Sequence, residues 1–364
     1  MISNIPTMTK VHNFSAGPGV LPEEVLKEAS RAVINFNNLN LSLLEISHRG
    51  KDFIEVMEEA RSLVKELLGL PSGYSVLFLG GGASLQFGMV PSNLLRANGT
   101  AAYVNTGVWA SKAIKESKII GNTKVIASSE DKNFNYIPKG FSIPTDADYL
   151  HITSNNTIYG TQYQEFPDCP IPLVCDMSSD IFSRKVDGSK FALIYAGAQK
   201  NMGPAGTTMV AVREDLLGKT ERKMLTMLDY AEHIKADSMY NTPPVYPIYV
   251  SMLTMKWLKD NGGLSWIEKL NNEKAALLYS EIDRNAMFQG TTAVEDRSKM
   301  NVTFVLKNAE LEGEFTKWAK EANLSGLPGH RSVGGFRASL YNALPIESVQ
   351  ALVDVMRAFE AKLG

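Results

Sequence analysis

Short apolar runs alternate with helical patterns through the first two-thirds of the chain. Most of these runs are apolar at consecutive positions, which is typical of strands buried on both faces of a sheet. Glycine, proline, asparagine or aspartate bounds each run, as expected at strand ends. The predicted strands are 75–79, 101–104, 124–127, 149–153, 171–175, 191–195 and 207–212. This alternation predicts an α/β fold with a mostly parallel, seven-stranded sheet.

The pattern changes near residue 241. A long helix is predicted there, with Thr242 as its N-cap and Pro243 in its first turn. A smaller α/β unit is expected to follow, with helices 264–284, 311–322 and 346–361 and strands 301–306 and 335–340. Earlier in the chain, residues 51–69 have helical periodicity. We therefore expect a large domain, 17–258, and a smaller C-terminal domain, 259–364, on which residues 1–16 can pack.

Composition narrows the class of protein. The net charge of the 364 residues is −2 and no long basic run occurs, so neither nucleic acid nor a membrane is expected as a partner. The N-terminus lacks the features of a secretory signal, and no apolar run approaches the roughly 20 residues of a membrane helix. Cys169 and Cys175 match neither a zinc pattern nor a disulfide framework. A cytoplasmic protein without a metal site is expected.

Lys200 lies in the segment "FALIYAGAQKNMGPAG", residues 191–206, directly after a predicted strand and among small residues. A lysine can simply be a surface residue. Here, however, the neighbouring small residues allow a close approach of backbone to a ligand, and the strand places the lysine at a sheet edge. A partly desolvated lysine has a lowered pKa and can act as a nucleophile that forms a Schiff base.

Two further sequence features are consistent with a ligand that binds beside Lys200. Asp176 ends the segment "IPLVCD"; it could cap a helix, but a carboxylate at a strand end also faces the ligand crevice of α/β folds. The glycine-rich turn in "LFLGGGASLQFG", residues 77–88, leads into a helix whose first N–H groups can bind a phosphate. A lysine, a carboxylate and a phosphate-binding turn together match the needs of pyridoxal 5′-phosphate.

At these positions the sequence resembles the phosphoserine aminotransferases, a family of fold-type I pyridoxal-phosphate-dependent transferases. The resemblance extends over nearly the whole chain. It is carried by "NFSAGPGVLPEEVL" (13–26), "EISHRGKDF" (45–53), "LGGGASLQF" (79–87), "NTGVWASKAIKE" (105–116), "SNNTIYGTQ" (154–162), "CDMSSDIFSR" (175–184), "YAGAQKNMGPAG" (195–206), "NTPPVYPIY" (241–249) and "GHRSVGGFRASLYNALP" (329–345).

The resemblance implies roles for individual residues. Lys200 would form the Schiff base and transfer protons, and Asp176 would pair with the pyridinium nitrogen. Trp109, otherwise an ordinary core aromatic, would stack on the cofactor ring, and Thr157 would bind its ring oxygen. The residues implied around the cofactor phosphate are Gly82, Ala83, Ser84 and Gln199, with Asn241 and Thr242 from the second subunit of a homodimer.

Basic residues would select the substrate. Arg337 resembles the residue that binds the α-carboxylate, for which a planar guanidinium is suited. The cluster implied for the substrate phosphate, or for the side-chain carboxylate of glutamate, consists of His48, Arg49, His330 and Arg331. Ala16 stands where some members have a serine that contacts the substrate, and Ala83–Ser84 replaces an Arg-Gly pair found in others. The resemblance therefore does not define the contacts that these three residues make.

The implied reaction transfers an amino group between L-glutamate and 3-phosphohydroxypyruvate, giving 2-oxoglutarate and O-phospho-L-serine in serine synthesis. Whether a related substrate of pyridoxine synthesis is also used stays open. One alternative is cysteine desulfuration, which needs a thiolate usually found late in the chain, whereas both cysteines precede Lys200. Another is a regulatory phosphate-binding protein without catalysis, against which the retained Lys200 and Asp176 argue.

Overall fold

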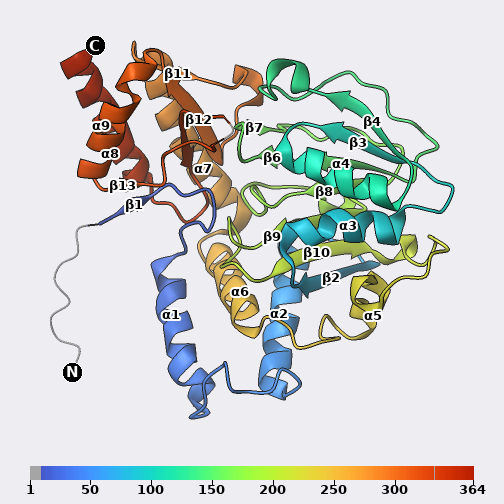
Figure 1. Ribbon diagram of the computed structural model, residues 1–364. Coiled ribbons are helices and arrows are strands. Elements are labelled where there is room, and N and C mark those ends of the chain that lie inside the picture. The colour runs from blue at the N-terminus through green and yellow to red at the C-terminus, as the bar shows by residue number, and fades with distance from the viewer. Residues whose placement is uncertain (1–9, 332) are drawn as a thin grey trace.

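The computed structural model describes residues 10–331 and 333–364 (Figure 1). The helices are α1 Glu23–Ile34, α2 Lys51–Leu68, α3 Gly82–Leu94, α4 Val108–Ile120, α5 Tyr230–Lys235, α6 Val245–Asp260, α7 Gly263–Arg284, α8 Glu312–Glu321 and α9 Ile346–Leu363. The strands are β1 His12–Asn13, β2 Tyr74–Leu79, β3 Ala101–Asn105, β4 Thr123–Ser128, β5 Tyr149–Thr153, β6 Asn155–Asn156, β7 Thr161–Gln162, β8 Leu173–Asp176, β9 Leu193–Gly197, β10 Thr208–Arg213, β11 Phe288–Gly290, β12 Asn301–Leu306, β13 Leu324–Ser325 and β14 Phe336–Ser339. Among the helices of the described ranges, none has the length and apolar character needed to cross a membrane.

Within the described residues, seven strands form the central sheet in the order β2-β10-β9-β8-β5-β3-β4. Strand β10 is antiparallel to both of its neighbours, and the other neighbouring pairs are parallel. These are the seven strands predicted from the apolar runs, and the predicted fold class is confirmed. Because β2, β3, β5, β8 and β9 run in one direction, the segments that follow them meet at a single edge of the sheet.

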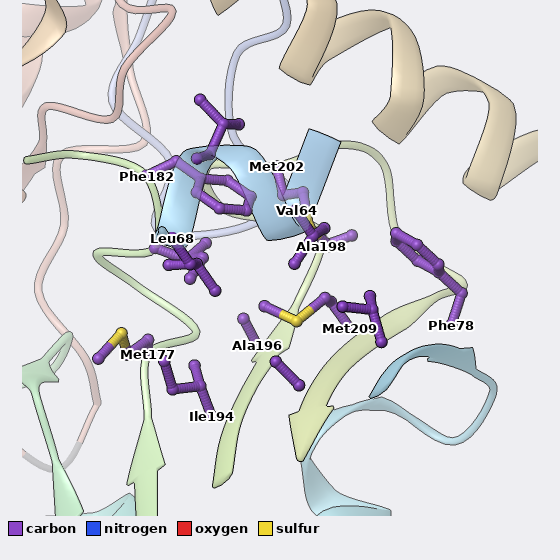
Figure 2. Packing of buried hydrophobic residues seen from close by; sticks show 14 of the residues in the cluster. Val64, Leu68, Phe78, Met177, Phe182, Ile194, Ala196, Ala198, Met202 and Met209 are labelled. Atoms are coloured by element: carbon purple, nitrogen blue, oxygen red, sulfur yellow. The ribbon is translucent and has the colours of Figure 1, made fainter. Parts of the chain in front are cut away.

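Helix α2 covers one face of this sheet, and Figure 2 shows the packing between them. Val64 and Leu68 of α2 lie over Ile194 of β9 and Met209 of β10. Two residues of the segment after β9 also belong to this core and are completely buried: Ala198 and Met202. They fix the backbone of the segment that carries Lys200.

Strand β4 departs from the expectation that the strands are buried on both faces. It is the edge strand of the sheet, and Val125 is 40% exposed. An edge strand has a neighbour on one side only, so its other side is open to solvent, and every residue of β4 is half-buried or exposed. The apolar run 124–127 identified the strand correctly but not its position at the edge.

The C-terminal part has its own sheet, formed by β11, β12 and β14, and its own core under α7, α8 and α9. Strand β11 was not predicted from the sequence; it has only three residues and lacks a distinct apolar run. The N-terminal strand β1 pairs in parallel with β13, and Phe14 is buried in this C-terminal core. The domain boundary near residue 258 stays a prediction.

The long helix α6 begins at Val245, three residues later than the predicted N-cap Thr242. The residue before a proline is disfavoured in the helical conformation. Pro243 is followed by Pro244, so Pro243 cannot easily belong to the first helical turn. The predicted capping role of Thr242 is therefore wrong, and its side chain remains available for other contacts.

The turn after β14 joins the C-terminal core to the segment that carries Lys200. The Asn342 N–H donates to the Asn201 Oδ1 atom at 2.9 Å, and the Asn342 Nδ2 atom donates to the Phe182 carbonyl at 2.9 Å. Lys274 of α7 is completely buried, and burial lowers its pKa to about 7. Its Nζ atom lies within hydrogen-bond distance of four backbone carbonyls in this turn: Leu340, Tyr341, Asn342 and Leu344. The turn is thereby fixed between α7 and the residue next to Lys200.

Candidate active site

Asp176 and Lys200 follow neighbouring strands at the common edge of the sheet. Asp176 is the last residue of β8, and Lys200 lies three positions beyond the end of β9. The two strands are parallel, with Asp176 opposite Tyr195. The predicted placement of both residues at strand ends agrees with this geometry.

The amine of Lys200 lies against polar and aromatic groups. Its Nζ atom donates to the Thr157 Oγ1 atom at 2.7 Å and lies 5.6 Å from the centre of the Trp109 ring. Burial lowers the pKa of Lys200 to about 8; the nearby negative charge of Asp176 opposes this shift, and the positive charge of Arg337 adds to it. A substantial fraction of the amine is therefore neutral near physiological pH, as a nucleophile requires.

The carboxyl group of Asp176 is only 4% exposed. Burial raises its pKa, while the hydrogen bond from Ser178, the charge of Lys200 and the hydroxyl of Tyr195 lower it. The Ser178 N–H donates to the Asp176 Oδ1 atom at 2.9 Å. A buried carboxylate of this kind gains most from a cationic partner, since desolvation otherwise disfavours its charge.

A cavity of about 130 Å³ lies between these two residues. It brings together most of the residues that the resemblance assigns to the cofactor. Its lining consists of Gly82, Ala83, Ser84, Phe87, Trp109, Thr153, Asn155, Asp176, Ser178, Ser179, Gln199 and Lys200. Thr157 is joined to this group through its hydrogen bond with Lys200. Sequence reasoning missed Phe87, Thr153, Asn155, Ser178 and Ser179; the last four are polar residues at or just after strand ends, which is the signal that could have identified them.

The first turn of α3 supplies N–H donors to this cavity. Gly81 precedes the helix with a φ of 87°, and no side chain caps it. The N–H groups of the first helical residues have no partner inside a helix. Since Gly82, Ala83 and Ser84 line the cavity, their N–H groups and the positive end of the helix dipole favour an anion there.

Two buried polar atoms of residues that line the cavity lack a hydrogen-bond partner in the described part of the protein, as expected where a ligand binds. Among the described residues, neither the Thr153 Oγ1 atom nor the Trp109 Nε1 atom has a hydrogen-bond partner. Buried polar atoms are usually paired, so such atoms at a cavity call for an explanation. Together with the free N–H groups of α3, they fit a polar, phosphorylated ring compound.

The N-terminal segment lies directly against Lys200. A Cβ atom on Gly17, whose φ is 139°, would lie 3.4 Å from the Lys200 Cγ atom. The Gly19 N–H donates to the Gln199 carbonyl at 2.7 Å, and the Tyr341 hydroxyl donates to the Ala16 carbonyl at 2.7 Å. The backbone of Ala16 is thereby tied to Tyr341, next to the segment that touches Lys200.

Arg337, from the C-terminal part of the chain, contacts Thr157, the residue that binds the amine of Lys200. The Arg337 Nη1 atom donates to the Thr157 carbonyl at 3.4 Å, and its Nε atom has no partner among the described residues. Burial lowers the pKa of Arg337 and of His330, and the pKa of His330 is lowered further by the positive charges of Arg337, Arg331 and Lys112. Positive charge thus gathers beside Lys200. Lys112 was not recognised from the sequence.

His48 and Arg49 lie elsewhere in the chain. They belong to the segment that connects α1 to α2, at the bottom of Figure 1 and far from the C-terminal sheet. Arg49 is exposed, and its N–H donates to the Ser47 Oγ atom at 3.2 Å. A single chain therefore does not bring His48 and Arg49 together with His330 and Arg331.

Asn241 and Thr242 also lie outside the Lys200 cavity. They line a neighbouring hollow of about 310 Å³, together with Gly80 and Leu85 near the start of α3. Both residues are exposed, and the Asn241 Nδ2 atom donates to the adjacent Thr242 carbonyl at 3.4 Å. Within one chain, neither residue contributes to the cavity around Lys200.

The two cysteines are poor candidates for sulfur chemistry. Cys175 is completely buried, and Cys169 is partly buried. Burial raises the pKa of both thiols, that of Cys175 well above its usual value. Because the thiolate is the nucleophile, these surroundings argue against cysteine desulfuration.

Comparisons with known proteins agree with this geometry. The family model of the class-V aminotransferases matches residues 11–352. The phosphoserine aminotransferase of Flavobacterium johnsoniae is 64% identical over 355 residues, which cover 97% of this chain and 100% of that protein.

Solved structures show the same relationship. The phosphoserine aminotransferase from Bacillus circulans subsp. alkalophilus superposes with a TM-score of 0.95 at 48% identity and covers 98% of this chain and 99% of its own. The PLP-bound phosphoserine aminotransferase from Trichomonas vaginalis has a TM-score of 0.91 at 37% identity, covering 96% of this chain and 100% of its own. The chain therefore belongs to the class-V aminotransferase family, among the phosphoserine aminotransferases.

Proposed function

We propose that this aminotransferase uses pyridoxal 5′-phosphate to transfer an amino group between L-glutamate and 3-phosphohydroxypyruvate, with O-phospho-L-serine and 2-oxoglutarate as the other pair. One observation carries the proposal. A single cavity is bordered by the partly neutral amine of Lys200, the buried carboxylate of Asp176 and the uncapped start of α3. The names of the relatives support the choice of substrate.

The cavity offers a partner for each part of the cofactor. When bound, pyridoxal 5′-phosphate supplies an aldehyde carbon that takes up the amino group and a ring that withdraws electrons. Asp176 would hold a proton on the ring nitrogen through its negative charge, and Trp109 would stack on the ring. The N–H groups of Gly82, Ala83 and Ser84, with the side chain of Gln199, would bind the phosphate.

Lys200 would act as nucleophile and as proton carrier. Its position 2.7 Å from the Thr157 hydroxyl holds the Nζ atom at the cavity. A pKa of about 8 allows the amine to accept a proton from the substrate Cα atom and then to release it near neutral pH. Thr157 would orient the amine and then bind the ring oxygen of the cofactor.

The basic residues would hold the substrate. Arg337 is half-buried, and the unpaired Nε atom and the weakly bonded Nη1 atom suit bidentate binding of the α-carboxylate. His330 and Arg331 would bind the substrate phosphate, or the side-chain carboxylate of glutamate. The low pKa of His330 would rise when a phosphate enters, because an anion favours the charged imidazole.

A homodimer would complete each site. His48 and Arg49, and likewise Asn241 and Thr242, lie outside the cavity of their own chain. We propose that they serve the partner's cavity, with Asn241 and Thr242 at the cofactor phosphate and His48 and Arg49 at the substrate phosphate. Two cysteines without a disulfide are consistent with the reducing cytoplasm, where we place the enzyme.

Covalent trapping tests this function. Borohydride reduction of the protein loaded with pyridoxal 5′-phosphate should label one peptide, the one that contains Lys200. Lys200→Ala should abolish both the label and amino-group transfer. A non-catalytic phosphate-binding protein would bind the cofactor without a covalent label, and that result would reject the proposal.

A further inference from the structure

Lys112 lies against Trp109, one of the residues that line the cavity around Lys200. It is one turn beyond Trp109 on α4, and residues three apart share a helix face. Its Nζ atom is 4.6 Å from the centre of the Trp109 ring, while the Nζ atom of Lys200 is 5.6 Å from the same centre. The Trp109 ring lines the cavity, so Lys112 stands beside the cavity with its ammonium held by the ring.

The charge of Lys112 is not neutralised within the chain. In the part of the chain that the structure describes, no carboxylate lies within 4 Å of Lys112, Arg331 or Arg337. Other exposed lysines do pair, such as Lys235 with Glu232 at 2.6 Å and Lys259 with Glu66 at 2.7 Å. Several unpaired cations beside one cavity create a field that favours an anionic ligand.

Lys112 interacts electrostatically with His330, although the two residues are distant in the sequence. The positive charge of Lys112 is among the causes that lower the pKa of His330, after burial and the charges of Arg337 and Arg331. This effect places the ammonium on α4 within electrostatic reach of the segment that precedes β14. The positive charges of α4 and of the segment that precedes β14 therefore act on one another.

On the basis of the proposed function, we propose that Lys112 binds the phosphate of the phosphorylated substrate and contributes to the preference for it over glutamate. A phosphate monoester carries about −1.5 to −2 charges near neutral pH, against −1 for a carboxylate. An additional cation therefore favours the phosphorylated substrate more strongly. The ammonium is a compact point charge on a flexible chain, so it can follow a phosphate that His330 and Arg331 position.

Three variants separate this role from others. Lys112→Gln removes the charge at similar length, Lys112→Arg keeps it, and Lys118→Gln removes an exposed charge at the far end of α4 as a control. All three should fold, because both side chains are exposed. Single-turnover kinetics with O-phospho-L-serine and with L-glutamate would give kcat/KM for each, and calorimetry would give the Kd of inorganic phosphate.

Lys112→Gln should lower kcat/KM for O-phospho-L-serine by about tenfold, the lower end of what a lost charge-assisted contact costs. The loss for L-glutamate should be several-fold smaller, and the Kd of inorganic phosphate should rise. Lys112→Arg should retain most activity, and Lys118→Gln should match the wild type. The affinity for the cofactor, followed by its absorbance, should be unchanged in every variant.

Equal losses for both substrates, or no loss in Lys112→Gln, would overturn the role of Lys112 while the proposed function stands. If the wild type does not react with O-phospho-L-serine at all, the proposed function fails instead. The binding of inorganic phosphate still tests Lys112 in that case. An unchanged Kd in Lys112→Gln would then reject the phosphate contact by itself.

Discussion

Thr157 connects the reactive amine to the guanidinium expected to bind substrate. The Lys200 Nζ atom donates to the Thr157 hydroxyl at 2.7 Å, and the Arg337 Nη1 atom donates to the Thr157 carbonyl at 3.4 Å. Lys200 follows β9 of the large sheet, whereas Arg337 lies in β14 of the C-terminal sheet. Thr157, directly after β6, therefore contacts two basic groups that come from different parts of the fold.

The ionisation of Lys200 should control how the cofactor-free chain captures pyridoxal 5′-phosphate. Because burial lowers the pKa of Lys200 to about 8, the amine is protonated below that pH and neutral above it. The rate of capture, followed by absorbance, should increase as the pH rises through about 8 and then level off. A midpoint near 10.5, the ordinary value for lysine, would contradict the burial of this amine.

Asp176→Asn should move this midpoint to a lower pH. The negative charge of Asp176 raises the pKa of Lys200, so its removal leaves the ammonium less favoured. Asp260→Asn, an exposed change at the end of α6, is the matched control and should leave the midpoint in place. Identical midpoints in Asp176→Asn and the control would show that the two groups do not interact.

Hybrid dimers should reveal whether sites are shared. Lys200→Ala chains and Arg49→Ala chains would each give nearly inactive homodimers. A purified hybrid with one chain of each kind should recover about half of wild-type activity, because one of its two sites would then combine an intact Lys200 with the partner's Arg49. An inactive hybrid would mean that Arg49 serves the cavity of its own chain, and a fully active Arg49→Ala homodimer would mean that it serves neither cavity.

Arginine substitutions should separate the two ends of the substrate. Arg331→Ala should weaken the reaction with O-phospho-L-serine more than that with L-glutamate, since it removes a contact of roughly 1.5–3 kcal/mol to the more highly charged group. Arg337→Ala should weaken both reactions alike, because both substrates carry an α-carboxylate. Single-turnover rates with each amino acid give the comparison. An Arg331→Ala loss equal for both substrates would reject its assignment to the phosphate.

Lys274→Met should destabilise the fold without touching the cavity. The buried Nζ atom is the donor next to four carbonyls in the turn after β14, and its loss leaves buried acceptors unpaired, at a cost of about 3 kcal/mol. Thermal unfolding would show a clearly lower Tm than in the control Lys269→Met, whose side chain is exposed on the same helix. Equal Tm values would mean that the turn does not depend on the Lys274 side chain.

The sequence predicted the parts of the fold that depend on local patterns. Continuous apolar runs identified the seven strands of the central sheet, and the strand ends placed Asp176 and Lys200 together. The exposed face of β4, the antiparallel direction of β10 and the short strand β11 depend on contacts between distant segments, so periodicity could not predict them. The start of α6 was missed because two consecutive prolines delay the helix.

The site was predictable to a similar extent. Residues at strand ends and at the start of α3 were identified from their neighbours in sequence. Lys112 was missed because its role depends on a ring three residues earlier and on charges more than 200 positions later. Whether His48, Arg49, Asn241 and Thr242 act in the partner's cavity depends on a second chain, and the hybrid dimers address that question.

The most direct measurement is the visible spectrum of the purified protein loaded with pyridoxal 5′-phosphate, during separate additions of O-phospho-L-serine, L-glutamate and L-serine. The first two should each change the cofactor band and release one equivalent of their oxo acid per site. L-Serine, which lacks the phosphate, should leave the band nearly unchanged. A band that responds to L-glutamate or L-serine but not to O-phospho-L-serine would contradict the proposed reaction.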